Sequence, residues 1–294
     1  MPYATNPVDG VRSYFEDSGG AGAPVLFYTG FADPLEVAKA SRLARALSAQ
    51  FRLIFADHRG QGGSDKPRDP SAYALATRVA DAAAVLDALG IERAHFLGSS
   101  WGARLGYAVG EYAPERVLSL VLCGNQPYAW NLESPTAQAV AAAIAASRRE
   151  GITGFVEAFE AALDYRFPEP ARTWTLEKND PAALDAAWRA VQVEGPISQD
   201  LGRWRVPCLI CAGEADEMHD AAERAAAEIP GAKFVSFAGH SHISAFYEAD
   251  DLLLPHILEL LRFTAPSRKR APRTTDPPEL RRRGRRDSNP PPPT

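Results

Sequence analysis

The chain contains 294 residues, of which 46% are hydrophobic and 23% charged, a composition typical of a globular protein with a sizeable core. It has no run of eighteen apolar residues, and its first ten residues lack the features of a signal peptide, so we expect no membrane span and a cytoplasmic location. Nine basic and three acidic residues give 265–294 a charge of +6, so residues 1–264 carry −11 of the formal total of −5. Such an acidic globular part disfavours nucleic acid as a partner.

Through the first 124 residues, short apolar runs alternate with longer segments of helical periodicity. Four of these runs predict buried strands: Val25–Tyr28, Leu53–Ala56, Ala94–Leu97 and Leu118–Cys123. Two longer segments, Leu35–Gln50 and Tyr73–Leu89, carry apolar residues at helical spacing and predict helices. Before them, Val11–Asp17 alternates with period two and predicts a half-exposed antiparallel strand at the edge of the sheet. This order predicts an α/β fold, a mostly parallel sheet flanked by helices on both faces.

The pattern changes between residues 125 and 200, where helical segments and frequent aromatic residues replace the strand-like runs. Helices are predicted at Thr136–Arg149, Gly154–Leu163 and Pro181–Val191. We interpret 125–200 as a helical cap inserted into an α/β core made of residues 1–124 and 201–264. The aromatic residues of this cap either form an apolar lid over a substrate or pack into the cap's own core.

The alternation of strand and helix resumes after residue 200. Strands are predicted at Cys208–Ala212 and Phe234–Phe237, and helices at Ala221–Ile229 and Leu252–Phe263. The last thirty residues, 265–294, combine four consecutive prolines with runs of arginine and almost no apolar side chains. We expect a disordered basic tail there, which is either an interaction segment or a dispensable terminus.

Two of the three cysteines, Cys208 and Cys211, form a Cys-x-x-Cys pattern of the kind that can indicate a redox or metal site. Both lie in an apolar run that predicts a buried strand, in which residues three apart point to opposite faces of the sheet. We therefore expect all three cysteines, Cys123 included, to be core residues. No metal and no cofactor is expected.

The pattern Gly98-Ser99-Ser100-Trp101-Gly102 lies between a predicted strand and a predicted helix. By itself Gly-x-Ser-x-Gly is a weak signal, but a tight strand-to-helix turn exposes the serine hydroxyl, and the glycines leave room for it. The following helix N-terminus favours negative charge that develops nearby. The alternative is a glycine-rich turn with a purely structural role. We predict Ser100 as a nucleophile.

A serine hydroxyl becomes a good nucleophile when a base takes its proton, and an acid must orient that base. Asp216 follows a buried strand and is the candidate acid, although Glu214 and Glu217 are close in sequence. The alternative role of Asp216 is to cap the next helix. Two histidines after the last predicted strand, His240 and His242, are candidate bases.

Taken together, four patterns resemble those of the α/β-hydrolase superfamily over about residues 11–263. Their matching residues are Asp57, Arg59, Gly60, Gly62 and Ser64, then Gly98, Ser100 and Gly102, then Gly213 and Asp216, then Gly239-His240-Ser241-His242. The middle insertion matches only in position. The resemblance implies a triad of Ser100, Asp216 and His242, while a shorter alignment would make His240 the base. The serine argues against the haloalkane dehalogenases and epoxide hydrolases of this fold, which use aspartate at this position.

The resemblance also implies an oxyanion hole formed by the backbone N–H groups of Phe31 and Trp101. Family members often carry His-Gly where this chain has Thr29-Gly30, so we expect the loop that holds Phe31 to be supported differently here. The segment Asp57–Ser64 is expected to shape a turn beside the site and is assigned no catalytic role.

These observations predict a serine hydrolase that forms an acyl-enzyme with a small or medium carbonyl substrate such as a carboxylic ester or lactone. A C–C bond hydrolase and a perhydrolase or haloperoxidase-like enzyme would use the same triad. A non-catalytic small-molecule binding protein of this fold is the alternative from another class. The expected partner is a small-molecule substrate, and the sequence leaves the oligomeric state open.

Overall fold

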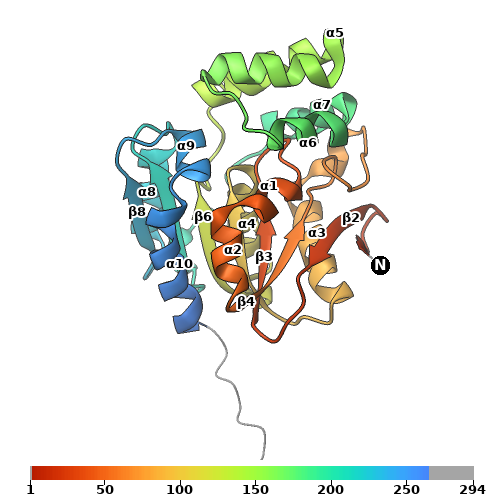
Figure 1. Ribbon diagram of the computed structural model, residues 1–294. Helices are drawn as coiled ribbons and strands as arrows, with labels where there is room; N and C mark the ends of the chain where they lie inside the picture. Colours follow the sequence, from red (N-terminus) through yellow and green to blue (C-terminus); the bar gives the residue numbers. More distant parts are fainter. Residues whose placement is uncertain (1, 265–294) are drawn as a thin grey trace, which may run out of the picture.

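An eight-stranded sheet forms the centre of the molecule in the computed structural model, which describes residues 2–264 apart from the side chains of residues 246 and 247 (Figure 1). The predicted tail, 265–294, lies outside the described residues. The strands are β1 (Tyr3–Thr5), β2 (Arg12–Asp17), β3 (Ala23–Tyr28), β4 (Phe51–Ala56), β5 (Ala94–Ser99), β6 (Val117–Cys123), β7 (Cys208–Gly213) and β8 (Lys233–Phe237). Their order across the sheet is β1-β2-β4-β3-β5-β6-β7-β8.

Strands β3 to β8 run parallel, and the first two strands are antiparallel to their neighbours. The predicted antiparallel strand at Val11–Asp17 corresponds to β2, but its predicted place at the edge of the sheet is wrong. Tyr3 of β1 pairs with Tyr14 of β2, so β1 is the edge strand. With only three residues, β1 is too short to leave a periodic pattern in the sequence. The predicted mostly parallel sheet is confirmed.

Helices cover both faces of the sheet (Figure 1). On one face lie α1 (Leu35–Ala40), α2 (Arg42–Ser48) and α10 (Asp250–Thr264), and on the other α3 (Leu75–Ala88), α4 (Trp101–Tyr112) and α8 (His219–Glu228). Side chains alternate along β3 between the two apolar clusters that result: Val25 and Phe27 pack with the first set, and Leu26 with the second. The remaining helices are α5 (Pro135–Leu163), α6 (Ala171–Lys178), α7 (Pro181–Gln192) and α9 (His242–Tyr247), with short 3-10 turns at Pro70–Tyr73, Pro114–Arg116 and Leu201–Arg203.

The helix predicted at Leu35–Gln50 is two helices, α1 and α2, which meet at Ser41. The backbone of Ser41 is extended (φ −65°, ψ 152°), and its hydroxyl accepts a hydrogen bond from the Ala44 N–H at 3.0 Å. A serine at this position caps the N-terminus of the second helix, and it therefore interrupts a segment whose apolar spacing is continuous. The prediction of one helix was wrong for this reason.

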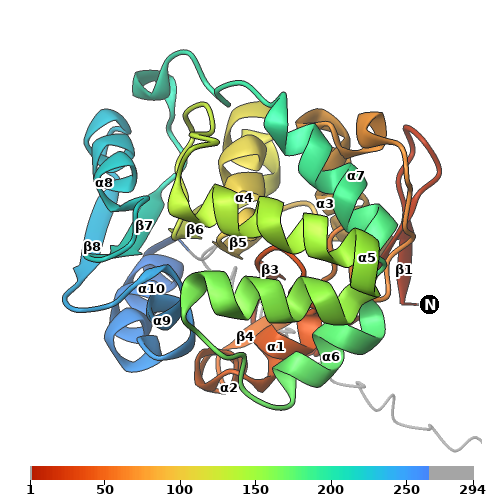
Figure 2. The same cartoon turned by 90° about the horizontal axis from the view of Figure 1, so that it is seen from above.

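Helices α5, α6 and α7 lie above the carboxyl edge of the sheet and cross over it (Figures 1 and 2). The backbone of Gly151 leaves the helical region (φ 69°, ψ −159°), which divides α5 into the two helical segments that the sequence predicts. A third apolar cluster joins these helices to the core, because Phe155 and Trp188 pack with Trp101, the first residue of α4. The helix α6 was missed, since its eight residues carry no clear apolar stripe.

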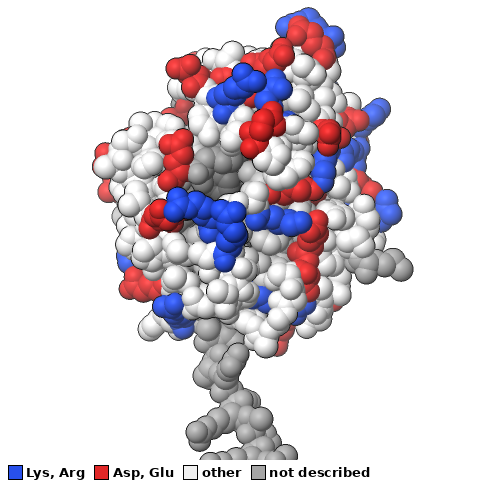
Figure 3. Space-filling view, viewed as in Figure 1, with Lys and Arg blue, Asp and Glu red and all other residues white. Residues whose placement is uncertain are grey.

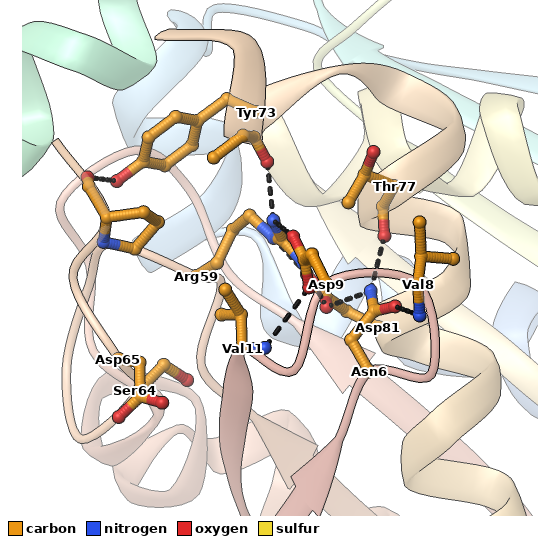
Figure 4. Close-up of polar contacts among 12 residues, drawn as sticks. Asn6, Val8, Asp9, Val11, Arg59, Ser64, Asp65, Tyr73, Thr77 and Asp81 are labelled. Atoms are coloured by element: carbon orange, nitrogen blue, oxygen red, sulfur yellow. Dashed lines mark hydrogen bonds and ion pairs between the residues drawn. The ribbon is translucent and has the colours of Figure 1, made fainter. Parts of the chain in front are cut away.

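A buried arginine ties the N-terminal segment to helix α3 (Figure 4). The Arg59 guanidinium is fully buried and donates to both carboxylate oxygens of Asp81, at 2.6 and 2.7 Å. It also donates to Asp9 at 2.7 Å and to the carbonyl oxygen of Ala72. Asn6 completes the cluster with a hydrogen bond to Asp81 at 2.7 Å. Because every charge in this cluster has a direct partner, the network can exist in the protein interior.

Lys and Arg side chains are interspersed with Asp and Glu on the face of the molecule shown in Figure 3. Arg42 and Asp251 are an example of an exposed ion pair. Among the described residues, no helix is both long enough and apolar enough to cross a membrane.

Candidate functional site

Ser100 occupies a strained turn between β5 and α4, with φ 49° and ψ −115°. The flanking glycines have no room for a side chain. A Cβ on Gly98 would lie 2.3 Å from the carbonyl oxygen of Gly102, and a Cβ on Gly102 would lie 2.2 Å from that of Tyr28. Since both obstacles are backbone atoms, neither can move aside, and this turn requires glycine at both positions.

The Ser100 side chain contacts one of the other predicted site residues, His242, which in turn contacts another, Asp216. Ser100 Oγ is 3.0 Å from His242 Nε2, and His242 Nδ1 is 2.9 Å from Asp216 Oδ2. His242 is the first residue of α9, and Asp216 stands in the loop after β7. The structure thus brings a hydroxyl, an imidazole and a carboxylate from three distant segments into one hydrogen-bonded chain.

Opposing effects act on the two ionisable groups of this chain. Burial alone would raise the pKa of Asp216, but the charge and hydrogen bond of His242, with the N–H of Met218, hold it below its ordinary value. Burial also disfavours the imidazolium form of His242. The charge and hydrogen bond of Asp216 outweigh that effect, with smaller contributions from Glu217 and Asp33, so the pKa of His242 is raised.

The alternative residues have other surroundings. The backbone carbonyl of His240 accepts a hydrogen bond from the Ala215 N–H at 2.9 Å, and its ring contacts the Phe237 ring edge to face. Within residues 2–264, the Ser100 hydroxyl forms a side-chain hydrogen bond with the His242 ring and none with His240. Glu217 caps α5, because its carboxylate accepts from the Thr136 N–H at 3.0 Å.

The loop after β3 carries Phe31, one of the two predicted oxyanion donors. In the described part of the chain, neither the N–H of Phe31 nor that of Trp101 donates a hydrogen bond to another protein group. The Thr29 hydroxyl donates to the carbonyl oxygen of Asp33 at 2.5 Å and so closes the loop. Threonine therefore braces the loop in this chain at the position where histidine is common in the resembling family.

Residues distant in sequence hold Ala32, which follows Phe31 and has a positive φ of 63°. Its N–H donates to Gln61 Oε1 at 2.9 Å, and its carbonyl accepts from Asn179 Nδ2 at 2.8 Å. Sequence reasoning missed both partners. Gln61 lies in the segment that was assigned only a turn, and Asn179 lies in the insertion, where no pattern distinguishes it.

Asp57 links the same loop to the turn that follows β4. Its carboxylate accepts from the Leu35 N–H and from the Gly63 N–H, both at 2.7 Å. Burial raises the pKa of Asp57 to about 7 despite these two hydrogen bonds. The hydroxyl of Ser64 donates to the Asp57 carbonyl at 2.9 Å and stabilises the turn. The expected role of this segment in shaping a turn agrees with these contacts, and Asp57 additionally anchors the loop of Phe31.

The indole of Trp101 is fixed between three side chains. The His58 ring stacks on it with the centroids 5.2 Å apart, and the Arg78 guanidinium lies 4.2 Å from an indole centroid. The Phe31 ring contacts it at 4.7 Å. A cation over an aromatic face and two ring contacts restrict the side chain of the residue that follows Ser100.

A cavity opens beside Ser100 and His242, at the carboxyl ends of β5, β6 and β7 and beneath α5 and α7. Its walls are mainly apolar and include Trp130, Phe159 and Trp188 from the 125–200 segment. Such a cavity excludes water from a reacting group and strengthens the electrostatic interactions inside it.

Two cysteines lie in the floor of this cavity. Cys123 of β6 pairs in register with Cys211 of β7, and their Sγ atoms are 2.7 Å apart. Cys208 and Cys211 belong to different apolar clusters, which confirms that the Cys-x-x-Cys residues point to opposite faces of the sheet. All three cysteines are buried, as predicted. Among the described residues, no group of three or more His, Cys, Asp or Glu side chains is arranged to hold a metal ion.

Comparison with known proteins adds independent information. The sequence model of the alpha/beta hydrolase fold family matches residues 23–249. The fluoroacetate dehalogenase of Burkholderia sp. is 27% identical over 78% of this chain and 84% of that enzyme. The 3-oxoadipate enol-lactonase 1 of Acinetobacter baylyi is 29% identical over 58% of this chain, and the match spans 64% of the lactonase, slightly less than two thirds.

Among solved structures, a thermophilic esterase from Thermogutta terrifontis superposes with a TM-score of 0.73, is 25% identical, and covers 89% of this chain and 98% of the esterase. The predicted fold and the predicted enzyme class, a hydrolase, are confirmed by these relatives. The roles of Ser100, His242 and Asp216 stay predictions. On the strength of the family match over most of its length, the chain belongs to the α/β-hydrolase fold family.

Proposed function

We propose that the protein is a serine hydrolase of carboxylic esters, with Ser100 as nucleophile, His242 as base and Asp216 as the orienting acid. The observation that supports this most directly is the hydrogen-bonded chain from Ser100 Oγ through His242 to Asp216, with distances of 3.0 and 2.9 Å. A hydroxyl on a strained turn, hydrogen-bonded to a base, is the arrangement that nucleophilic catalysis by serine requires.

The proposed reaction proceeds through an acyl-enzyme. As Ser100 Oγ attacks the carbonyl carbon, its proton passes to His242 Nε2, and the N–H groups of Phe31 and Trp101 stabilise the oxyanion. The bond to the leaving oxygen then breaks, and His242 returns the proton to that oxygen. Water, deprotonated by His242, next attacks the acyl carbon, which releases the acid and restores the serine hydroxyl. Asp216 keeps the imidazole oriented and stabilises its charged form.

The segment 125–200 is proposed to act as a cap that shapes the acyl site. Several of its aromatic residues have both of the expected roles. Phe159 and Trp188 line the cavity and also belong to the cluster between the cap and the core, against which Trp130 packs, whereas Phe155 belongs to the cluster alone. A cap with an apolar inner wall favours apolar acyl groups, because their burial removes hydrocarbon from water.

Lactones are a second candidate substrate class for the same site. The 3-oxoadipate enol-lactonase named among the relatives is the observation that favours them. Ring opening of a lactone uses the same attack by Ser100 and the same proton transfers, but the leaving oxygen stays joined to the acyl group through the carbon chain, so that water releases one product, the hydroxy acid.

The two histidine candidates provide the test of this proposal. Wild type and the variants His242→Ala and His240→Ala would be incubated with p-nitrophenyl hexanoate and, separately, with a fluorophosphonate probe. We expect His242→Ala to lose roughly 10⁴-fold in kcat and to label far more slowly, because the hydroxyl loses its base. His240→Ala should keep both activities, since the hydrogen-bonding contact of His240 is made by its backbone. Equal losses in both variants, or a wild type that neither reacts nor labels, would contradict the proposal.

The pH dependence follows from the raised pKa of His242. The base must be neutral to take the serine proton, so kcat/KM should fall as the pH is lowered through a pKa above the ordinary histidine value of about 6.5. Glu217→Gln removes one of the charges that raise this pKa and should move the inflection to lower pH. A pH–rate profile measured on both proteins checks the prediction, and an inflection below pH 6 in wild type would refute it.

A further inference from the structure

A tight turn of four residues, 30–33, carries the proposed oxyanion donor Phe31 at its second position. The carbonyl oxygen of Gly30 accepts a hydrogen bond from the Asp33 N–H at 3.4 Å, and the third residue, Ala32, has a positive φ of 63°. A positive φ at the third position is characteristic of a type II turn, in which glycine is the preferred residue there. Because alanine has a Cβ, this backbone is unfavourable for it, and the turn needs support from other parts of the chain.

Two buried side chains bond to the backbone of Ala32 and supply that support. Gln61 accepts from its N–H at 2.9 Å, and Asn179 donates to its carbonyl oxygen at 2.8 Å. Turns of types I and II differ mainly by a rotation of the peptide between the second and third residues, and in type I the third residue has a negative φ. Loss of either hydrogen bond should therefore let the turn relax toward a form that alanine adopts without strain.

Asn179 makes this support depend on the proposed cap, because it lies between α6 and α7 (Figure 2). The residues on either side of it also reach the core. Lys178 forms an ion pair with Glu36 of α1, and Asp180 forms one with Arg68 at 3.1 Å. Three consecutive residues thus attach the cap to the core, and the middle one bonds to the turn that carries the oxyanion donor.

We propose that Gln61 and Asn179 are positioning residues for the oxyanion. They hold the turn in its strained form, and through Asn179 the position of the Phe31 N–H depends on how the cap is seated. This inference rests on the proposed esterase function and adds two residues to it. Since the oxyanion forms only as Ser100 attacks, a displaced Phe31 N–H should weaken binding of the transition state and leave binding of the substrate nearly unchanged.

The test compares Asn179→Ala and Gln61→Leu with wild type. For p-nitrophenyl hexanoate we expect each variant to lower kcat/KM by about 10- to 100-fold, less than complete loss of the oxyanion hole because the Trp101 N–H remains. Gln61 belongs to the core, so Gln61→Leu tests the turn even if Asn179→Ala is too unstable to assay.

Two inhibitors separate the oxyanion from the rest of the site. A trifluoromethyl ketone with a hexyl chain accepts Ser100 Oγ at its carbonyl carbon, the serine proton passes to His242, and the carbonyl oxygen becomes an oxyanion. The methyl ketone with the same chain stays largely unreacted and reports binding of the chain alone. In both variants the inhibition constant of the trifluoromethyl ketone should rise by about the factor lost in kcat/KM, and that of the methyl ketone should change by less than about twofold.

A second substitution at residue 32 distinguishes positioning from a general structural role. The Asn179 amide also donates to the carbonyl oxygen of Thr175 at 3.1 Å, so Asn179→Ala loosens the end of α6 as well. Ala32→Gly removes the cost of a positive φ and favours the type II turn without that amide. Added to Asn179→Ala, it should restore kcat/KM to within about threefold of wild type, whereas a defect confined to α6 would not respond to it.

The matched control is Arg68→Ala, which removes the ion pair of the neighbouring Asp180 and leaves the turn untouched. It should keep wild-type kcat/KM and both inhibition constants. If Asn179→Ala and Gln61→Leu change kcat/KM no more than Arg68→Ala, if both ketones lose affinity equally, or if Ala32→Gly restores nothing, the positioning role is refuted while the esterase function stands. A wild type that does not hydrolyse the ester would overturn the proposed function and this inference with it.

Discussion

Replacing Ser100 with alanine is expected to lower kcat for p-nitrophenyl hexanoate by about 10⁴- to 10⁶-fold, because no other group can form the acyl-enzyme. Alanine retains the Cβ of serine, so the strained backbone at φ 49° and the neighbouring glycines are undisturbed. Some acceleration over the uncatalysed reaction should remain, since the variant keeps the proposed oxyanion donors, the N–H groups of Phe31 and Trp101. Release of p-nitrophenol and labelling by a fluorophosphonate are the two measurements.

A matched serine outside the cavity provides the control for that experiment. The Ser236 hydroxyl bonds to His219 Nε2 at 2.8 Å, on the side of β8 away from the cavity walls. Ser236→Ala should therefore keep its labelling and its turnover. Unchanged thermal unfolding of Ser100→Ala would show that only the chemistry was lost. If Ser100→Ala kept more than a tenth of wild-type kcat, the assignment of the nucleophile would be wrong.

Replacing Arg59 with methionine is expected to lower the free energy of unfolding by about 3–5 kcal/mol. The side chain of Asp81 is only 5% exposed and would lose its ion-pair partner in the interior, where Asn6 is the one other side chain among the described residues that donates to it. Burial already raises the pKa of Asp81 against the opposing effect of Arg59, so without that arginine the carboxyl group would be protonated more readily. Equilibrium unfolding in urea, at one pH, measures the change.

Two further variants make this prediction specific. Arg59→Met combined with Asp81→Leu replaces the pair with apolar side chains, and it should recover much of the lost stability because no buried charge remains unpaired. Arg42→Ala removes an exposed pair, in which Arg42 and Asp251 are 67% and 71% exposed, and should cost less than about 1 kcal/mol. If Arg59→Met lowered the free energy of unfolding as little as Arg42→Ala does, the buried network would contribute little to stability.

The main elements of the fold could be predicted because their signals are local. The apolar run Ala94–Leu97 lies within β5, and the segment Tyr73–Leu89, with its apolar residues at helical spacing, contains α3. Burial of one face of an element, or of both, leaves such a pattern in the sequence. The errors arose where a local feature outweighed that period. Ser41 caps a helix inside a continuous apolar pattern, and β1 is too short to show alternation.

The candidate site could be predicted in part for a topological reason. Parallel strands end at one edge of a sheet, so polar residues that follow different strands are expected to lie near one another. Ser100 and His242 are 142 residues apart in sequence, and their side chains lie within hydrogen-bonding distance. Two histidines lie at nearly the same place in the chain, and only the resemblance to the family, not the local pattern, favoured His242 over His240. Their different side-chain directions, one toward Ser100 and one toward Phe237, exist only in the folded chain.

Local patterns in the sequence were enough to predict most strands and helices in their order, the serine turn and the small set of polar residues that can stand at the carboxyl edge of the sheet. Only the tertiary structure decided which residues support that set, such as Asn179, whose amide holds Ala32 across 147 residues of sequence. It also decided that Asp33 faces the cavity and that Arg59 meets Asp81. The physical reason is that periodicity and turn chemistry depend on neighbours along the chain, whereas these contacts depend on packing between segments that share no local pattern.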